Sequence, residues 1–233
     1  MDFLKNLFKS KAKVDVPLRA SAPVPVPTKT PDPVSGPSVE RVSAASFLAS
    51  VAAGDLEKVK AILKNFPALV SCKESGGWGE TPLHKAVSEE NIEMVKLLLA
   101  NKADVNAKDA NDGTPLFDAV NKNNEELVRV LLTGKPVINA SSCHGGYRPL
   151  HSAKSRKIAE LLITHGADVH VKNDSGSTPM HNAAQKGITD VVECLIAHGA
   201  DVNAKNQYGA SVVSMVAGSN TALIELLRKH GGR

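Results

Sequence analysis

A tetrapeptide that recurs at a nearly constant interval constrains the fold of this chain more than any other feature. Its clear copies are Thr81-Pro82-Leu83-His84, Thr114-Pro115-Leu116-Phe117, Arg148-Pro149-Leu150-His151 and Thr178-Pro179-Met180-His181, and degenerate copies begin at Ala45 and Ser211. The first residues of successive copies are 36, 33, 34, 30 and 33 positions apart. A period near 33 is typical of stacked repeats, in which each unit buries its apolar face against its neighbours. The chain is therefore expected to form a linear array of units.

The second unit shows most clearly what each repeat contains. After the tetrapeptide comes a polar break at residues 88–91, and residues 92–99 then place apolar side chains at helical spacing. An extended polar connection follows at residues 103–109. Each unit is thus predicted to contain a helix, a turn, a second helix and a projecting loop, which we call a finger.

The chemistry of the tetrapeptide suits the start of a helix. Thr is a good N-cap because its hydroxyl accepts a backbone N–H bond, and Pro fits the next position because its fixed φ is helical. Leu is expected to point into the stack, and His to form a hydrogen bond towards the finger. Gly166 and Gly199 are predicted to end the second helices with a positive φ.

These residues resemble the ankyrin repeat family, whose signature T-P-L-H-x-A appears as residues 81–86 and whose G-A-D-V-N appears as residues 199–203. The resemblance covers residues 44–233 in six units, of which the first and last are expected to act as caps. It implies an all-α solenoid of helix-turn-helix units with β-hairpin-like fingers. It also implies a non-catalytic scaffold without cofactors, which binds a partner protein through its fingers and concave helix face.

The fourth unit departs from the pattern. About three residues are missing between His151 and Ile163, and Arg148 replaces the capping Thr. The first helix or the inter-helix turn must therefore be shorter there. We expect this unit to be the least stable part of the array.

The N-terminal residues lie outside the repeats. Residues 1–13 form a short basic amphipathic segment, and residues 14–43 form a linker that holds seven of the thirteen prolines. Together they are predicted to be a disordered tail. Segment 1–13 could anchor the protein weakly to an anionic membrane as a peripheral adaptor, dock into a groove, inhibit its own repeats, or remain a solvated tail.

Charge and cysteine usage restrict the classes of function and the cellular compartment. Residues 1–43 carry seven Lys or Arg against four Asp or Glu, whereas the remaining residues carry 21 against 20. The repeats lack the basic footprint of a nucleic-acid binder. Three cysteines without a paired pattern, and a first segment without a secretory signal, favour a cytoplasmic protein. The histidines recur at repeat positions and lack the spacing of a zinc site.

Two fingers are longer than the period requires, and the scarce aromatics fall on finger segments. Residues 73–80 exceed the common length by about three residues, and residues 142–147 by about one. The single tryptophan and both tyrosines lie on fingers, and these residue types are common interface anchors. The alternative is that each aromatic folds back and stiffens the array. The predicted partner-binding residues are Trp78, His144, Tyr147 and Tyr208 and, by the family resemblance, Ser88, Glu89, Asn121, Lys122, Gln185 and Lys186.

Overall fold

The computed structural model describes residues 42–75, 77–142, 145–216, 218 and 220–233. Segment 1–13, nearly all of the linker 14–43, Cys143 and His144 lie outside these residues. The predictions made for them are therefore not addressed by the structure.

The described chain is all-α and consists of short helices in sequence order. The elements are α1 (Ala44–Ala52), α2 (Leu56–Asn65), η1 (Pro67–Ser71), α3 (Pro82–Ser88), α4 (Ile92–Ala100), α5 (Pro115–Lys122), α6 (Glu125–Thr133), η2 (Pro149–Ser152), α7 (Arg156–Thr164), α8 (Pro179–Gln185), α9 (Thr189–Ala197), η3 (Val213–Met215) and α10 (Thr221–Lys229), where η denotes a 3₁₀ helix.

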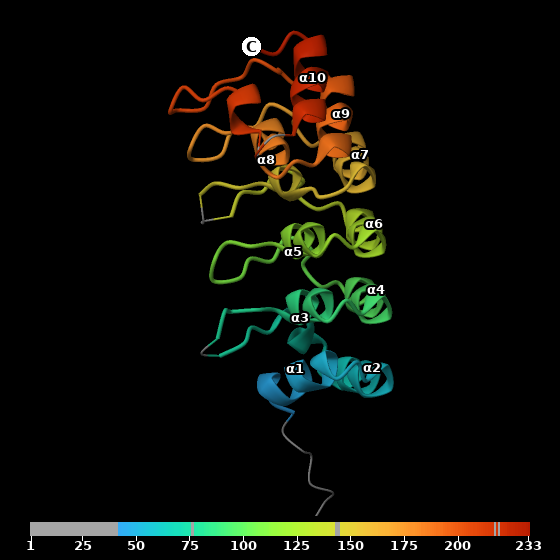
Figure 1. The fold of residues 1–233 in the computed structure, drawn as a ribbon. Coiled ribbons are helices and arrows are strands. Elements are labelled where there is room, and N and C mark those ends of the chain that lie inside the picture. The colour runs from blue at the N-terminus through green and yellow to red at the C-terminus, as the bar shows by residue number, and fades with distance from the viewer. Residues whose placement is uncertain (1–41, 76, 143–144, 217, 219) are drawn as a thin grey trace, which may run out of the picture. The chain divides into compact units, whose positions relative to one another are not determined.

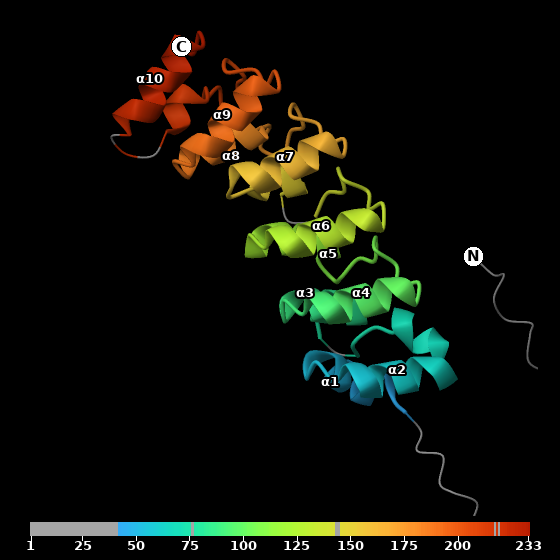
Figure 2. The same cartoon turned by 90° about the vertical axis from the view of Figure 1, so that its right-hand side faces the viewer.

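The helices stack in two layers, as the resemblance predicted (Figure 1). One layer holds the first helices of successive units, with α3 packed between α1 and α5, and η2 between α5 and α8. The other holds the second helices, in which α4 contacts α2 and α6, and α7 contacts α6 and α9. The fingers project from one side of the stack in Figure 1, and the helix pairs lie across its length in Figure 2.

One continuous apolar core joins the units. Residues at matching positions of successive units, such as Leu83 and Leu116 in the first layer and Leu98 and Leu131 in the second, are at most 1% exposed. Each layer thus contributes an apolar stripe that the next unit covers, which is how a solenoid buries surface without closing on itself.

The helix ends form as the tetrapeptide predicted. The Thr81 and Thr114 hydroxyls accept bonds from the backbone N–H groups of His84 (3.4 Å) and Phe117 (3.3 Å), and a proline occupies the first helical position in both helices. Gly166 and Gly199 follow α7 and α9 with φ of 94° and 80°. That left-handed conformation is accessible to glycine without a Cβ penalty.

The tetrapeptide histidines connect adjacent units, and we call each such contact a histidine bridge. Nε2 lies 3.2 Å from the Gly113 oxygen for His84, 3.0 Å from the Ser177 oxygen for His151, and 3.3 Å from the Ala210 oxygen for His181. On the other side of each ring, Nδ1 accepts the backbone N–H of the N-cap residue of the same unit, at 3.2–3.3 Å. This pattern requires a neutral ring with its proton on Nε2.

Burial favours the neutral form of these rings. It lowers the pKa of His84 and His181, and it lowers the pKa of His151 to about 4. The third unit cannot form a histidine bridge, because Phe117 occupies the histidine position.

The fingers have hairpin-like hydrogen bonds but little strand. Asp109 N–H donates to the Gly113 oxygen (3.0 Å), and the other fingers have equivalent bonds, while the isolated bridge in the described chain joins Lys205 and Ser211. Neighbouring fingers are also bonded, since Ala110 N–H donates to the Trp78 oxygen at 2.7 Å.

The first helices of the fourth and sixth units are reduced to the 3₁₀ helices η2 and η3. The shortening of the fourth unit was predicted. That of the sixth was not: a full helix was expected there, but residues 211–216 lack the capping Thr-Pro pair and contain three β-branched valines, which disfavour a helix.

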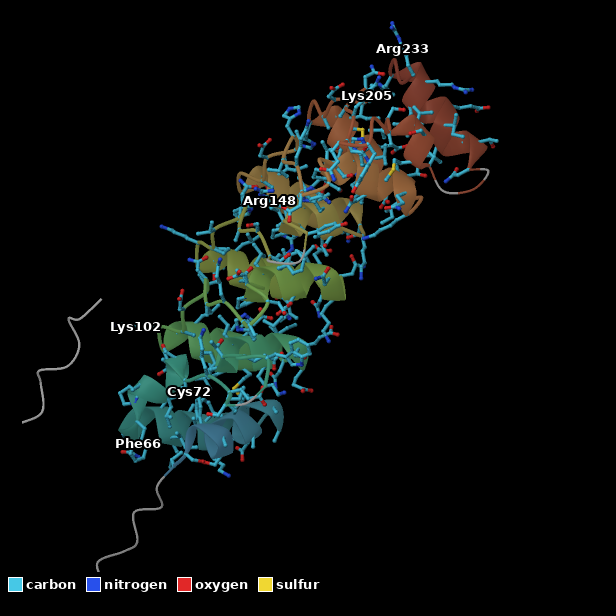
Figure 3. The ribbon with its side chains drawn as sticks, turned by 90° about the vertical axis from the view of Figure 1, so that its left-hand side faces the viewer. Phe66, Cys72, Lys102, Arg148, Lys205 and Arg233 are labelled. Carbon is cyan, nitrogen blue, oxygen red and sulfur yellow. The ribbon has the colours of Figure 1, made fainter. Side chains whose placement is uncertain are left out.

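Arg148 lies midway along the stack (Figure 3) and compensates in part for the lost threonine cap of the fourth unit. Its guanidinium donates to the Lys172 oxygen at 2.7 Å and to the Gly146 oxygen at 3.3 Å. These bonds connect the third finger to the fourth.

Candidate functional site

A hollow of about 490 Å³ lies where the first two fingers meet the C-terminal ends of α3 and α5. We call it the finger groove. Four of its lining residues are among the predicted partner-binding residues, namely Trp78, Ser88, Asn121 and Lys122. Folding therefore brings together residues that are up to 44 positions apart in the sequence.

Trp78 forms an aromatic wall of the finger groove. Its side chain is 63% exposed, although its backbone oxygen is bonded to Ala110 in the next finger. The backbone of the first finger is thus anchored, while the indole stays open to solvent. An exposed indole beside a hollow is typical of an interaction surface.

Lys122 is less available to a ligand than its exposure implies. Its Nζ donates to the Ser88 backbone oxygen at 2.9 Å, at the C-terminal end of α3. A cation at this end of a helix compensates the partial negative charge of the helix dipole. The lysine side chain therefore connects α5 to α3.

Sequence reasoning missed the acidic lining of the finger groove, which comes from Glu80, Asp109 and Asp118. Glu80 pairs with Lys85 at 3.6 Å. The Asp109 carboxylate accepts the backbone N–H groups of Asn111 (2.8 Å) and Gly113 (2.7 Å), which shapes the turn of its own finger. The groove therefore combines an aromatic wall with negative charge.

Asp118 differs from the other two carboxylates. Its carboxylate makes no hydrogen bond or ion pair with any residue in the described ranges, and the residue is only partly exposed in the first turn of α5. Burial, followed by the charges of Asp109 and Glu80, raises the pKa of its carboxyl group to about 7. A strongly perturbed carboxyl group in a hollow is a common mark of a functional site.

The sequence next to the tetrapeptide already marks Asp118 as unusual. The residue after the His position is Lys85 in the second unit, Ser152 in the fourth and Asn182 in the fifth, so Asp118 is the acidic exception among units two to five. The sequence could not show that Glu80 and Asp109, which lie on two different fingers, line the same hollow.

The remaining predicted residues lie elsewhere along the array. Glu89 is exposed next to Ser88, and Gln185 and Lys186 are exposed at the equivalent end of α8. Tyr208 is 77% exposed on the last finger. These four residues do not line the finger groove.

Tyr147 is turned towards the first helix of the next unit, η2. Its ring is half-buried and meets the His151 ring edge to face, with ring centroids 5.7 Å apart. This contact is consistent with the alternative in which an aromatic folds back and stiffens the array.

The structure bears on two further properties of the described residues. They hold no group of three or more His, Cys, Asp or Glu side chains arranged to bind a metal ion. No helix among them is long and apolar enough to cross a membrane.

Comparisons with known proteins add a family and several partial relatives. A family model described as ankyrin repeats (three copies) matches residues 46–142, 105–173, 135–206 and 150–232. The B-cell lymphoma 3 protein of Homo sapiens is 37% identical over 117 residues, which are 49% of this chain and 26% of that protein.

Two other relatives match in the same partial way. The putative ankyrin repeat protein FPV230 of fowlpox virus (strain NVSL) is 32% identical over 107 residues, 45% of this chain and 56% of that protein. The nuclear factor NF-kappa-B p105 subunit of Gallus gallus is 34% identical over 128 residues, 53% of this chain and 13% of that protein. The chain thus matches about a quarter of the length of the B-cell lymphoma 3 protein, little more than half of FPV230 and about an eighth of the p105 subunit.

Proposed function

Because this chain belongs to the ankyrin repeat family, we propose that residues 44–233 bind a partner protein through the finger side of the stack without catalysing a reaction. Ankyrin repeat domains are typically protein-binding modules and usually non-catalytic. The finer part of the proposal is the location: the partner contacts the fingers and the C-terminal ends of the first helices.

One observation carries this location. The only tryptophan of the chain is 63% exposed at the wall of the finger groove, on the side of the stack from which the fingers project. A large exposed aromatic is unfavourable in water and becomes a strong contact once a partner covers it. Tyr208 extends the same edge towards the last unit.

The alternative role of residues 1–13, in membrane contact or self-inhibition, concerns residues that the structure does not describe. Deleting these residues tests it independently. Loss of binding to anionic vesicles would favour the peripheral adaptor, and a higher affinity for the partner would favour self-inhibition.

The proposed surface is tested by affinity capture followed by mass spectrometry with the full chain. We expect Trp78→Ala to lose a set of proteins that the wild type captures. The matched control is Phe66→Ala, which removes another exposed aromatic (38%) at the end of α2, outside the finger groove. Identical protein sets for the wild type and Trp78→Ala would contradict the proposal.

A further inference from the structure

The negative charge of the finger groove is only partly neutralised within the chain. Lys85 pairs with Glu80, and backbone N–H groups bind Asp109, but Asp118 has no partner among the residues that the structure describes. A partly buried carboxylate without a partner is unfavourable in the free protein. The groove therefore presents one carboxylate whose charge remains to be compensated.

The lysines near the groove are engaged elsewhere. Lys122 donates to the Ser88 oxygen, Lys73 donates to the Lys108 oxygen at 3.0 Å, and Lys108 pairs with Asp112 at 3.3 Å. None of these three lysines forms an ion pair with Asp118, although the charge of Lys122 lowers the pKa of that carboxyl group. A ligand can therefore supply a positive charge that the chain itself does not place there.

The exposed indole adds a second, independent preference for a cation. The Trp78 ring lines the same hollow as Asp118. Cations are attracted to the face of an aromatic ring, and tryptophan provides the strongest such contact. An aromatic face and a carboxylate that line one hollow are complementary to a flat, positively charged group.

We infer that the finger groove binds an arginine side chain of the partner protein, with its guanidinium group between the Trp78 indole and the Asp118 carboxylate. This inference rests on the proposed function and specifies the chemistry of the partner. Arginine fits better than lysine, because its planar guanidinium can stack on an indole and donate two parallel hydrogen bonds to a carboxylate. The hollow of about 490 Å³ is large enough for one such long side chain.

The test uses the full chain and two synthetic peptides, identical except at one position. One has a central arginine among neutral residues, and the other has citrulline, which keeps the shape but lacks the charge. Trp78 is the only tryptophan, so its fluorescence reports binding directly. At constant ionic strength, we expect the arginine peptide to change this fluorescence saturably and the citrulline peptide to bind at least about tenfold more weakly.

Asp118→Asn should weaken binding of the arginine peptide about tenfold while retaining the fluorescent reporter. Asp112→Asn is the matched control, since it makes the same charge change on the finger that precedes α5, at a residue that does not line the groove. It should leave the affinity within about twofold. Equal binding of both peptides, or an unchanged affinity in Asp118→Asn, would overturn the inference.

The partner proteins captured by the wild type separate this inference from the proposed function. If Trp78→Ala loses them and Asp118→Asn retains them, the surface is correct and the arginine contact is wrong. If both variants retain them, both proposals fail.

Discussion

Asp118 shows how a single partly buried charge can be unfavourable for folding. Its carboxyl pKa is about 7 in the folded protein and near 3.8 in the unfolded chain. Between these two pH values the folded state therefore holds a proton that the unfolded state releases. Folding stability contributed at this position is therefore highest at low pH and falls as the pH rises from about 4 to about 7. Binding sites often carry such unfavourable groups.

We predict that Asp118→Asn stabilises the free protein at pH 8 by about 1–2 kcal/mol, a value reduced for the partial exposure of the side chain and its place in the first turn of α5. At pH 4 the gain should vanish, because the wild-type carboxyl group is then protonated in the folded state. Denaturant unfolding at both pH values measures the difference. An equal effect at pH 4 and pH 8 would rule out the charge as its cause.

The end of each second helix shows how an element depends on one residue. Gly166 and Gly199 occupy the second position after α7 and α9. Lys102 occupies the equivalent position after α4, with φ of 65°. A residue with a Cβ is disfavoured in this left-handed conformation. The helix ends in the same way, but with local strain.

We expect Lys102→Gly to raise the free energy of unfolding by about 0.5 kcal/mol, because the relief of strain exceeds the added entropy of the unfolded chain. Lys102→Ala keeps the Cβ and serves as the control, with no gain. Thermal denaturation of the two variants and the wild type measures these changes in stability. A gain for alanine equal to that for glycine would show that removal of the lysine charge is responsible.

Across the whole molecule, the histidine bridges make the stack sensitive to acid. Burial lowers the pKa of His84, His151 and His181, so their contribution to stability is complete above about pH 6.5 and is lost as the pH falls, for His151 down to about pH 4. For His151 this loss is about 2–3 kcal/mol. The melting temperature should therefore fall over this range, and His151→Gln should show a shallower fall. Parallel curves for the two proteins would contradict this role.

The junction between the third and fourth units is expected to open first. Phe117 cannot form a histidine bridge there, and the fourth unit begins with the short helix η2. Amide hydrogen exchange should therefore be faster in residues 148–163 than in residues 82–100. Equal protection of the two segments would show that Arg148 and the core compensate fully.

How much of the fold and of the finger groove could be predicted from the sequence depends on how far apart in the sequence the interacting residues lie. The caps at Thr81 and Thr114 and the glycines after α7 and α9 follow from local backbone chemistry, and the structure confirms them. The exposed Trp78 was identified because its finger departs from the period. Asp118 was missed, because its raised pKa depends on burial and on Glu80 and Asp109, which come from two fingers.

The sequence by itself determined the family, the all-α repeat and the positions at which the helices with a clear tetrapeptide start, but not the short first helix of the sixth unit. These properties rest on interactions between residues a few positions apart, repeated at a regular interval. Only the tertiary structure decided that Tyr147 turns inward, that Trp78 remains exposed, and that Glu80, Asp109 and Asp118 line one hollow. Burial and charge are set by side chains from adjacent units, and their proximity exists only after the units have stacked.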